Sequence, residues 1–405
     1  MGYLRSIRTL QRGRPLDTIK DAPSFFISSI LERATWPTMR DRAFTRDELR
    51  EYVSSTGQIW EYGPKFDVEF PDSFPFSIGP FRNETGTRRI DPPFVCDLPD
   101  SQLVGPNPIA ITSDGNPVIE STRGNVRNLR NAHRELPIKF HLRLLTDGNL
   151  ASTNGDHADC VLPLWMPHTR YYHWLLEYLP KLQAVDVYTE QTGRKPTLLL
   201  RENPPGWMSR SMEVLGFDSY RKWSGGTLNV DHLVIPTHRL KSARYDYNPS
   251  HVEYEWLRDR ALESIDDVQS NRFSSRVYIS REDADRRRVA NEPEVMDLLE
   301  KRGFEAYKLT DLDFTDQIRL FNQADVIAGP HGGGFANLVF SRQAKVVEFL
   351  PTSHPAPYFF YLSHELGLKY TRLNCDPIGD NRSPKHWNMK VDIDRLESVL
   401  DRTLN

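Results

Sequence analysis

The chain of 405 residues is poor in cysteine and lacks long apolar runs. Its three cysteines, Cys96, Cys160 and Cys375, lie far apart, and no Cys-x-x-Cys pair occurs. Such a set argues against a disulfide framework or a zinc site and favours a reducing compartment. No apolar run is long enough to span a membrane, and no signal-peptide pattern opens the sequence. We therefore expect a cytoplasmic protein, with association at the cytoplasmic face of a membrane left open.

The chain also lacks a large net charge of either sign. Its formal net charge is -3 and its pI is near 6.5, which argues against a protein that holds nucleic acid by bulk charge. The length is sufficient for two or three domains. Residues 1–35 combine Arg and Lys with scattered Ile, Leu and Phe. This composition favours an ordinary solvated helix, and a helix lying on a membrane surface is the alternative.

Three consecutive glycines, Gly332, Gly333 and Gly334, follow a short apolar segment. Residues 326–328 are apolar and partly β-branched, so they predict a buried strand, and the residues after the glycines can begin a helix. A strand, a glycine turn and a helix start direct backbone N–H groups at an anion. His331 adds a donor, and Glu348 lies near the end of the next predicted strand. The alternative is a tight turn that binds nothing.

A second segment, residues 171–182, has helical periodicity. Its apolar stripe comprises Leu175, Tyr178, Leu179 and Leu182. His173 and Glu177 are four residues apart, so they share a face, and at 100° per residue this face lies opposite the stripe. The pair is therefore expected to point towards solvent or a cleft, and a solvated ion pair is the alternative interpretation. Pro180 should kink or shorten the helix.

The remaining pattern predicts an α/β protein. Residues 108–120 read as a hairpin with an Asp-Gly turn, and the helix–strand alternation after residue 160 favours a parallel layer. In the last third we expect repeated β-α units forming a doubly wound sheet, whose ligands bind beyond the carboxyl ends of strands. We place an N-terminal extension at residues 1–85, a first Rossmann-like domain at 86–255 and a second at 256–405.

A basic loop follows the first strand of the last third. It contains Arg281 and the pair Arg287-Arg288, and then Asn291, which with Glu294 has the spacing of a capping box. Arginine suits a diphosphate because its planar fork donates two parallel hydrogen bonds. The alternative interpretation is a solvated basic loop.

Together the three stretches resemble glycosyltransferase family 61. The glycine turn is similar to the family's PHGAGLTN signature, His173–Pro180 to its HWLLExLP stretch, and the loop to its Arg, Arg-Arg, Asn-Glu pattern. The resemblance covers roughly residues 160–350. It departs from the signature at Gly333, Phe335 and Ala336, where the family has Ala, Leu and Thr.

The resemblance implies a GT-B fold, in which two Rossmann-like domains face a cleft. It also implies inverting transfer of a sugar from a nucleoside-diphosphate sugar to a hydroxyl of a glycan or lipid-linked glycan, with neither metal nor cofactor. Glu177 would remove the acceptor proton, and His173 would orient it or touch the acceptor. The residues implied in donor binding are Arg281, Arg287, Asn291, His331, Gly332, Gly333, Gly334, Asn337 and Glu348.

Two other functions remain open. A metal-dependent transferase would use an Asp-x-Asp motif, and such motifs begin at Asp283, Asp311 and Asp392. The last two precede predicted amphipathic helices, where Asp is an ordinary cap. A nucleotide-binding scaffold protein would keep the glycine turn but would not need Glu177.

Overall fold

The computed structural model describes residues 22–70, 86–152, 154–165, 169–238, 251–265, 272–354, 356–380 and 383–404. The chain divides into two compact units, and strands β4, β7 and β10 pass from one into the other. Unit 1 comprises Met1–Gln58, Asp97–Asp159 and Ser224–Leu233. Unit 2 comprises Ile59–Cys96, Cys160–Trp223 and Val234–Asn405. The boundaries predicted at residues 85 and 255 stay a prediction.

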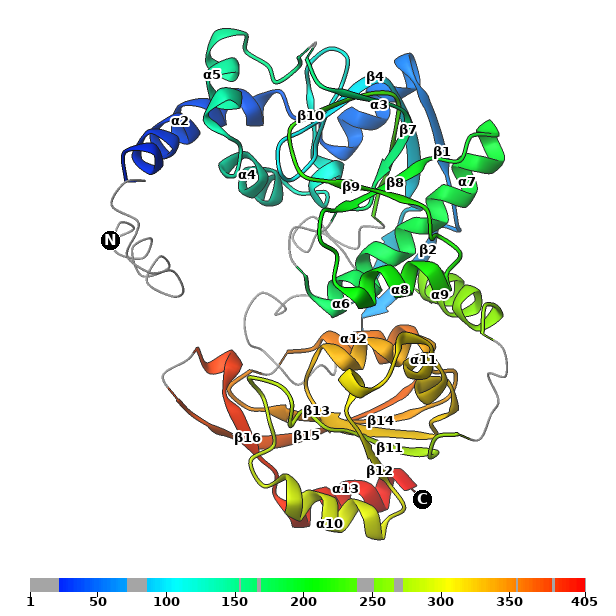
Figure 1. Cartoon of the computed structure of the whole chain (residues 1–405). Coiled ribbons are helices and arrows are strands. Elements are labelled where there is room, and N and C mark those ends of the chain that lie inside the picture. Colours follow the sequence, from blue (N-terminus) through cyan, green and yellow to red (C-terminus); the bar gives the residue numbers. More distant parts are fainter. Residues whose placement is uncertain are drawn as a thin grey trace. The chain divides into compact units, whose positions relative to one another are not determined.

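Unit 1 contains four α-helices within its described residues: α2 (Ala22–Asp41), α3 (Arg46–Thr56), α4 (Val126–Arg134) and α5 (Ile138–Thr146). Thr45 and Glu48 form a capping box at the start of α3. Helix α2 packs against both α4 and α5 (Figure 1). The hydroxyl of Thr35 joins the three helices, because it lies 2.9 Å from Nε2 of His133 and 2.9 Å from Nδ1 of His141.

The first large sheet has eight strands in the order β6-β5-β4-β10-β7-β8-β9, with β1 paired to β4. These strands are β1 (Gln58–Glu61), β4 (Phe94–Val104), β5 (Ile109–Ile111), β6 (Pro117–Val118), β7 (Asp156–Pro163), β8 (Thr197–Arg201), β9 (Tyr220–Trp223) and β10 (Thr227–Pro236). The predicted hairpin is confirmed as antiparallel β5 and β6, with Gly115 in a left-handed conformation at its turn. The β7-β8-β9 part is parallel, as predicted.

Helices connect these parallel strands within unit 2. After β7 the chain forms one turn of α-helix, α6 (Tyr171–His173), then the π-helical turn η3 (Trp174–Tyr178) and the 3-10 turn η4 (Leu179–Leu182). Helices α7 (Gln183–Thr192), α8 (Gly206–Val214) and α9 (His251–Glu263) follow. The change of helix type at Pro180 agrees with the predicted interruption. A further small sheet pairs β2 (Phe66–Phe70) with β3 (Gly86–Ile90) in antiparallel fashion.

The second large sheet has the order β12-β11-β13-β14-β15-β16. Its strands are β11 (Arg276–Ile279), β12 (Glu305–Tyr307), β13 (Val326–Pro330), β14 (Lys345–Pro351), β15 (Lys369–Ile378) and β16 (Asn388–Lys390). The first five are parallel, which confirms the predicted β-α units. Strand β16 is antiparallel to β15 and was not predicted. This parallel sheet agrees with the α/β fold class that the sequence predicts.

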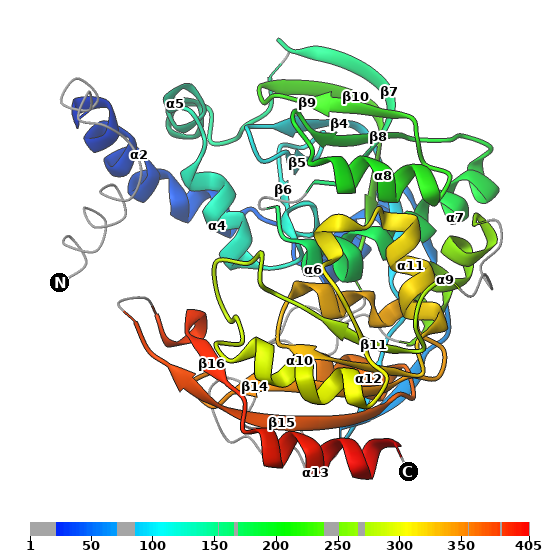
Figure 2. The same ribbon diagram turned by 60° about the horizontal axis from the view of Figure 1, so that its bottom comes forward.

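Helices cover both faces of this sheet (Figures 1 and 2). Helices α10 (Glu292–Lys301) and α13 (Ile393–Leu404) pack on the face that carries Tyr278, in a core with Val347 and Phe349. The opposite face carries Val277 and Ile327 and packs on α11 (Phe314–Gln323), the 3-10 helix η6 (Gly333–Phe340) and α12 (Tyr358–Glu365). Successive strand residues thus reach opposite layers, which is why the strands are apolar throughout.

In the described part of the chain, none of the helices combines the length and apolarity needed to span a bilayer.

Candidate active site

The glycine turn begins where β13 ends, at the carboxyl edge of the second large sheet. Strand β13 approaches β11 very closely here, since a Cβ on Gly329 would lie 2.8 Å from the backbone oxygen of Ile279. The backbone N–H of His331 donates to the oxygen of Phe349, 2.9 Å away. Residues 333–340 then form a 3-10 helix rather than an α-helix. The predicted strand, turn and helix are therefore present, with a tighter helix.

Arg281 crosses this turn. A Cβ built on Gly332 would lie well inside van der Waals contact with Nη1 and Cζ of Arg281, so a side chain at this position would displace the guanidinium. Nη2 of Arg281 donates to the oxygen of Arg286, 3.2 Å away, whereas its buried Nε has no hydrogen-bond partner among the described residues. A buried donor without a partner carries a desolvation cost that an anion would remove.

His331 is held from behind by two other side chains. Its Nδ1 lies 2.5 Å from Oε1 of Glu348, and the hydroxyl of Tyr370 donates to Oε2 of Glu348 at 2.5 Å. Glu348 is fully buried. Both of its oxygens are therefore engaged inside the protein, and a role in holding ribose stays a prediction.

Positive charge gathers around this turn. Nε of Arg287 donates to the oxygen of His331 at 3.1 Å, from a residue with φ of 54°. The pKa of Arg287 is lowered to about 10, first by burial and then by the charges of Arg281, Arg286 and Arg170. Guanidinium groups crowded in this way favour a bound polyanion, because an anion relieves both their burial and their mutual repulsion.

Residues 384–386 lie outside the three motifs and add basic groups to those around the glycine turn. We call Arg281, Arg286, Arg287, Lys385 and His386 together the basic wall. His386 in the 3-10 turn η7 (Pro384–His386) lies 2.9 Å from Nη1 of Arg286, and Nη1 of Arg287 donates to the oxygen of Lys385 at 3.1 Å. His354 is close as well: its pKa falls to about 4, first through burial and then through the charge of His331. Further positive charges lower the pKa of His354; they belong to Arg287, Lys385 and His386.

The predicted pair, His173 and Glu177, is present in a different setting from the one expected. Nδ1 of His173 lies 2.5 Å from Oε1 of Glu177. The side chain of Glu177 is only 4% exposed, whereas that of His173 is 21% exposed. The prediction that Glu177 points towards solvent or a cleft is therefore wrong. The π-helical turn explains this, because the N–H of Leu179 bonds to the oxygen of Trp174, five residues back, and this changes the angular spacing of side chains.

The pair and the glycine turn are neighbours within unit 2. The hydroxyl of Tyr171 lies 2.6 Å from Oδ1 of Asn337 in η6. The ring of Tyr172 contacts those of His173, Tyr358 and Phe359. Those last two rings also pack against His331. One aromatic cluster thus joins the carboxylate–imidazole pair to the basic wall.

Two predicted donor-binding residues make hydrogen bonds within the protein, and their role in donor binding stays a prediction. Nδ2 of Asn337, a fully buried residue, donates to Gln317 and to the oxygen of Gly334. Asn291 pairs through both side-chain atoms with the backbone of Val391. The predicted capping box at Asn291 is wrong, because its side chain makes no cap bond to the helix backbone.

The remaining glycines differ in how tightly they are held. A Cβ on Gly334 would lie 2.5 Å from Cδ1 of Leu309, whereas one on Gly333 would meet only the backbone nitrogen of Tyr172, at 3.9 Å. Gly333 is therefore the position of the turn with most room for a ligand or a side chain.

Sequence reasoning did not identify Arg170, Arg286, His354, Lys385 or His386. Arg286 directly precedes the pair Arg287-Arg288, and this run of three arginines could have identified it. Lys385 and His386 form a basic pair more than fifty residues after the glycine turn, and no local pattern connects the two.

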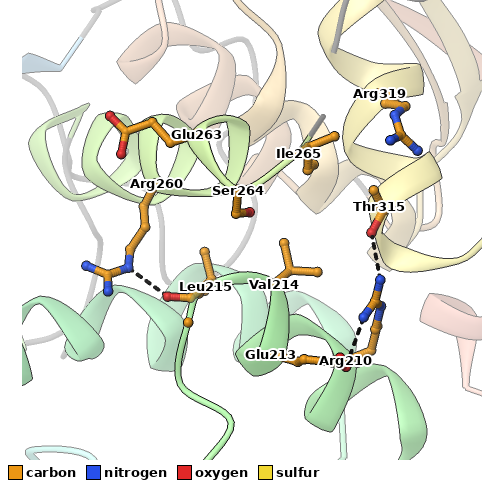
Figure 3. Close-up of a pocket in the computed structure, with 11 residues that line it drawn as sticks. Arg210, Glu213, Val214, Leu215, Arg260, Glu263, Ser264, Ile265, Thr315 and Arg319 are labelled. Atoms are coloured by element: carbon orange, nitrogen blue, oxygen red, sulfur yellow. Dashed lines mark hydrogen bonds and ion pairs between the residues drawn. The ribbon is translucent and has the colours of Figure 1, made fainter. Parts of the chain in front are cut away.

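A separate hollow of about 710 Å³ lies between the carboxyl ends of α8 and α9 and the start of α11 (Figure 3). Nε of Arg260 donates to the oxygen of Leu215 at 2.7 Å, and Arg210 pairs with Glu213 at 2.9 Å. None of the predicted site residues lines this hollow.

Within the described residues there is no cluster of three His, Cys, Asp or Glu side chains that could hold a metal ion. Two of the Asp-x-Asp motifs act as the caps that the sequence predicts. Asp313 accepts from the backbone nitrogen of Asp316 at 2.7 Å, and Asp392 accepts from that of Arg395 at 3.1 Å. In the third motif, Asp283 accepts from the hydroxyl of Thr310 at 2.6 Å.

The sequence model of the family Glycosyltransferase 61 matches residues 171–347. Over these residues, which make up less than half of the chain, the sequence is similar to glycosyltransferase family 61. The match includes the pair, the arginine loop and the glycine turn, so the resemblance seen in the three motifs is confirmed. The same match supports the predicted glycosyltransferase activity, which for the whole chain stays a prediction. Arg170 and the segment around Lys385 lie outside the matched region.

A relative of known activity supports this assignment. A beta-1,2-xylosyltransferase from Oryza sativa subsp. japonica is 29% identical over 96 residues, which cover 22% of this chain and 18% of that protein. The chain therefore shares less than a fifth of the length of this relative, and the similarity concerns one segment.

Proposed function

We propose that this chain transfers a sugar from a nucleoside-diphosphate sugar to a hydroxyl group of a glycan or lipid-linked glycan, with inversion at the anomeric carbon. The observation that carries the proposal is the proximity, within one compact unit, of a carboxylate–imidazole pair and the half-buried Arg281 and Arg287. A base and a diphosphate site are the two components that this transfer needs.

We propose that His173 is the base and that Glu177 orients it, which reverses the roles expected from the sequence. Glu177 is buried behind His173, so the more exposed imidazole is the group that can meet an acceptor. If Nδ1–H of His173 donates to Glu177, the ring carries its lone pair on Nε2. A buried carboxylate in this position fixes the tautomer and stabilises the imidazolium that forms.

In the proposed reaction, Nε2 of His173 takes the proton of the acceptor hydroxyl while that oxygen attacks the anomeric carbon. The bond from this carbon to the diphosphate oxygen breaks, and the nucleoside diphosphate leaves with the electron pair. Arg281 and Arg287 stabilise the charge that develops on the diphosphate, together with backbone N–H groups of the glycine turn.

We further propose the GT-B arrangement, with residues 86–255 and 256–405 as its two Rossmann-like domains. Two parallel sheet regions flanked by helices support this proposal. The most direct test of the donor class is a thermal-shift screen with UDP, GDP and dTDP, because a ligand that binds only the folded state raises Tm. We expect at least one of them to stabilise the parent protein and Arg281→Ala to lose most of that shift. A screen in which no nucleoside diphosphate stabilises the protein would contradict the proposal.

We propose that no divalent metal takes part. The hydrogen bonds of Asp313, Asp392 and Asp283 within the protein support this, as does the supply of positive charge by arginine. Donor hydrolysis or transfer should therefore survive EDTA. Complete loss of turnover, restored by added manganese or magnesium, would instead favour a metal-dependent transferase.

A further inference from the structure

Exposed aliphatic side chains concentrate on the helices of unit 1. Seven large hydrophobic residues are exposed in the described part of the chain, and five of them lie on α2, α4 and α5. These five are Ile27, Ile30, Val126, Leu142 and Leu145. Single exposed apolar residues are normal on protein surfaces and need no explanation. Five of them on three packed helices do need one.

On α5 these side chains form a stripe. Ile138, Leu142 and Leu145 follow the i, i+4, i+7 spacing of one helix face, and Leu142 and Leu145 are 49% and 51% exposed. The opposite face holds Phe140 and Leu144, which are buried in the core of unit 1. Helix α5 therefore carries apolar residues on two opposite faces. Among the described residues, only the face with Phe140 and Leu144 is buried against the rest of the protein.

Helix α2 has a similar outer face. Ile27 and Ile30 are 48% and 51% exposed, and Ala34 lies on the same side. The inner side carries Thr35, whose hydroxyl bonds to α4 and α5, and Met39, which is fully buried. These contacts fix α2 to its neighbours while its outer aliphatic residues stay exposed.

The same three helices carry a strong excess of positive charge. Their sequences contain seven Arg and Lys residues against two acidic ones, in a chain whose net charge is -3. Helices α4 and α5 contain no acidic residue. Residues 1–21, which directly precede α2, add five basic and two acidic side chains. Arg33, Arg127 and Lys139 are exposed beside the aliphatic positions.

We propose that the surface formed by α2, α4 and α5 binds an anionic lipid bilayer, lying on it without crossing it. Aliphatic side chains next to Lys and Arg are the composition of an interfacial helix, because the apolar groups enter the headgroup region and the cations meet the lipid charge. Nucleic acid would use the cations but would gain little from Leu142 and Leu145. This inference is independent of the proposed reaction, since it concerns other residues in the other compact unit.

The test is co-sedimentation of the full chain with vesicles of phosphatidylcholine alone and of phosphatidylcholine mixed with phosphatidylglycerol. We expect binding only to the mixed vesicles, weakened by added salt. The double variant Leu142→Ser/Leu145→Ser should lower the partition coefficient about tenfold or more, because both side chains would bury apolar surface in the interface. The matched control is Ile378→Ser, an exposed aliphatic residue on β15, which should bind like the parent.

A charge pair of variants tests the electrostatic part. Lys139→Glu should weaken binding about fivefold or more, because each basic residue near an anionic surface contributes about 1 kcal/mol. Lys390→Glu, at an exposed lysine in the second large sheet, should not. Melting curves would verify that all four variants fold. Equal binding by parent and variants would overturn the proposal. So would a vesicle-independent dimer that Leu142→Ser/Leu145→Ser dissolves, because the face would then join two copies of the chain.

Discussion

The guanidinium group of Arg281 lies directly across the α-carbon of Gly332. No side chain, not even a methyl group, fits between them in the arrangement that the chain adopts. The glycine therefore serves to admit an arginine at the carboxyl edge of the sheet.

Replacement of Gly332 by Ala should displace Arg281 and weaken nucleoside-diphosphate binding. Loss of one charged hydrogen-bonding group corresponds to about 1.5–3 kcal/mol, or about tenfold to a hundredfold in Kd. Calorimetric titration would measure this. The matched control is Gly206→Ala at the start of α8, where no atom lies within 4 Å of the added Cβ. Parental affinity in the Gly332 variant would mean that Arg281 does not contact the donor.

Asn337 was predicted to contact the donor, yet it is buried in a network with Tyr171 and Gln317. We expect Tyr171→Phe to lower the free energy of unfolding by about 1–3 kcal/mol, because Oδ1 of Asn337 loses a short hydrogen bond in a buried setting. Nucleotide affinity should stay within about twofold. Denaturant unfolding and titration of one preparation measure both quantities. An unchanged stability with weakened nucleotide binding would restore the donor role of Asn337.

Acid should weaken unit 1 through its two buried histidines. The pKa of His133 is lowered to about 3, first by burial and then by the charge of His141; burial also lowers the pKa of His141. Because these rings bind protons more weakly in the folded than in the unfolded chain, stability is fully present above about pH 6.5. It should then fall steadily as pH drops from 6.5 towards 3.

The variant His133→Gln should flatten this slope. Glutamine keeps a side-chain donor that can reach Thr35, but glutamine does not titrate. The pH-dependent part of the stability should therefore shrink to the contribution of His141. The two slopes are compared by measuring the free energy of unfolding of both proteins between about pH 7 and about pH 4. The control is His157→Gln, at an exposed histidine paired with Asp231. Identical slopes in His133→Gln and the parent would contradict the assignment.

The second large sheet was largely predictable because its signals are local. Apolar runs such as residues 326–328 and 346–350, separated by glycines and amphipathic segments, determined the order of its β-α units. The glycine turn and the pairing of His173 with Glu177 were predictable for the same reason. Each depends on residues within one or two helical turns.

The sequence-based predictions were wrong where contacts between residues far apart in the chain, or an irregular helix, determine the structure. A spacing of 100° per residue placed Glu177 on the outside, but the π-helical turn at 174–178 changes that phase and buries it. Asn291 has the spacing of a cap, yet it bonds to Val391, a hundred residues away. The contribution of His386 to the basic wall likewise depends on the return of the chain after β15.

The proposed division of roles between His173 and Glu177 makes the central claim about this site. If His173 is the base, His173→Gln should lower kcat about 10²–10⁴-fold, the usual contribution of a positioned base. Glu177→Gln keeps an acceptor oxygen for His173 and should cost less. Nucleoside-diphosphate affinity should persist in both variants. Glu213→Gln, at an exposed glutamate on α8, is the control.

The most direct test is therefore kcat for His173→Gln and Glu177→Gln, measured across pH beside nucleotide affinity. The account predicts the larger loss of kcat in the histidine variant, the smaller loss in the glutamate variant and donor binding in both. A histidine variant that turns over at the parental rate, while Glu177→Gln is inactive and still binds donor, would contradict it. The carboxylate itself would then be the base.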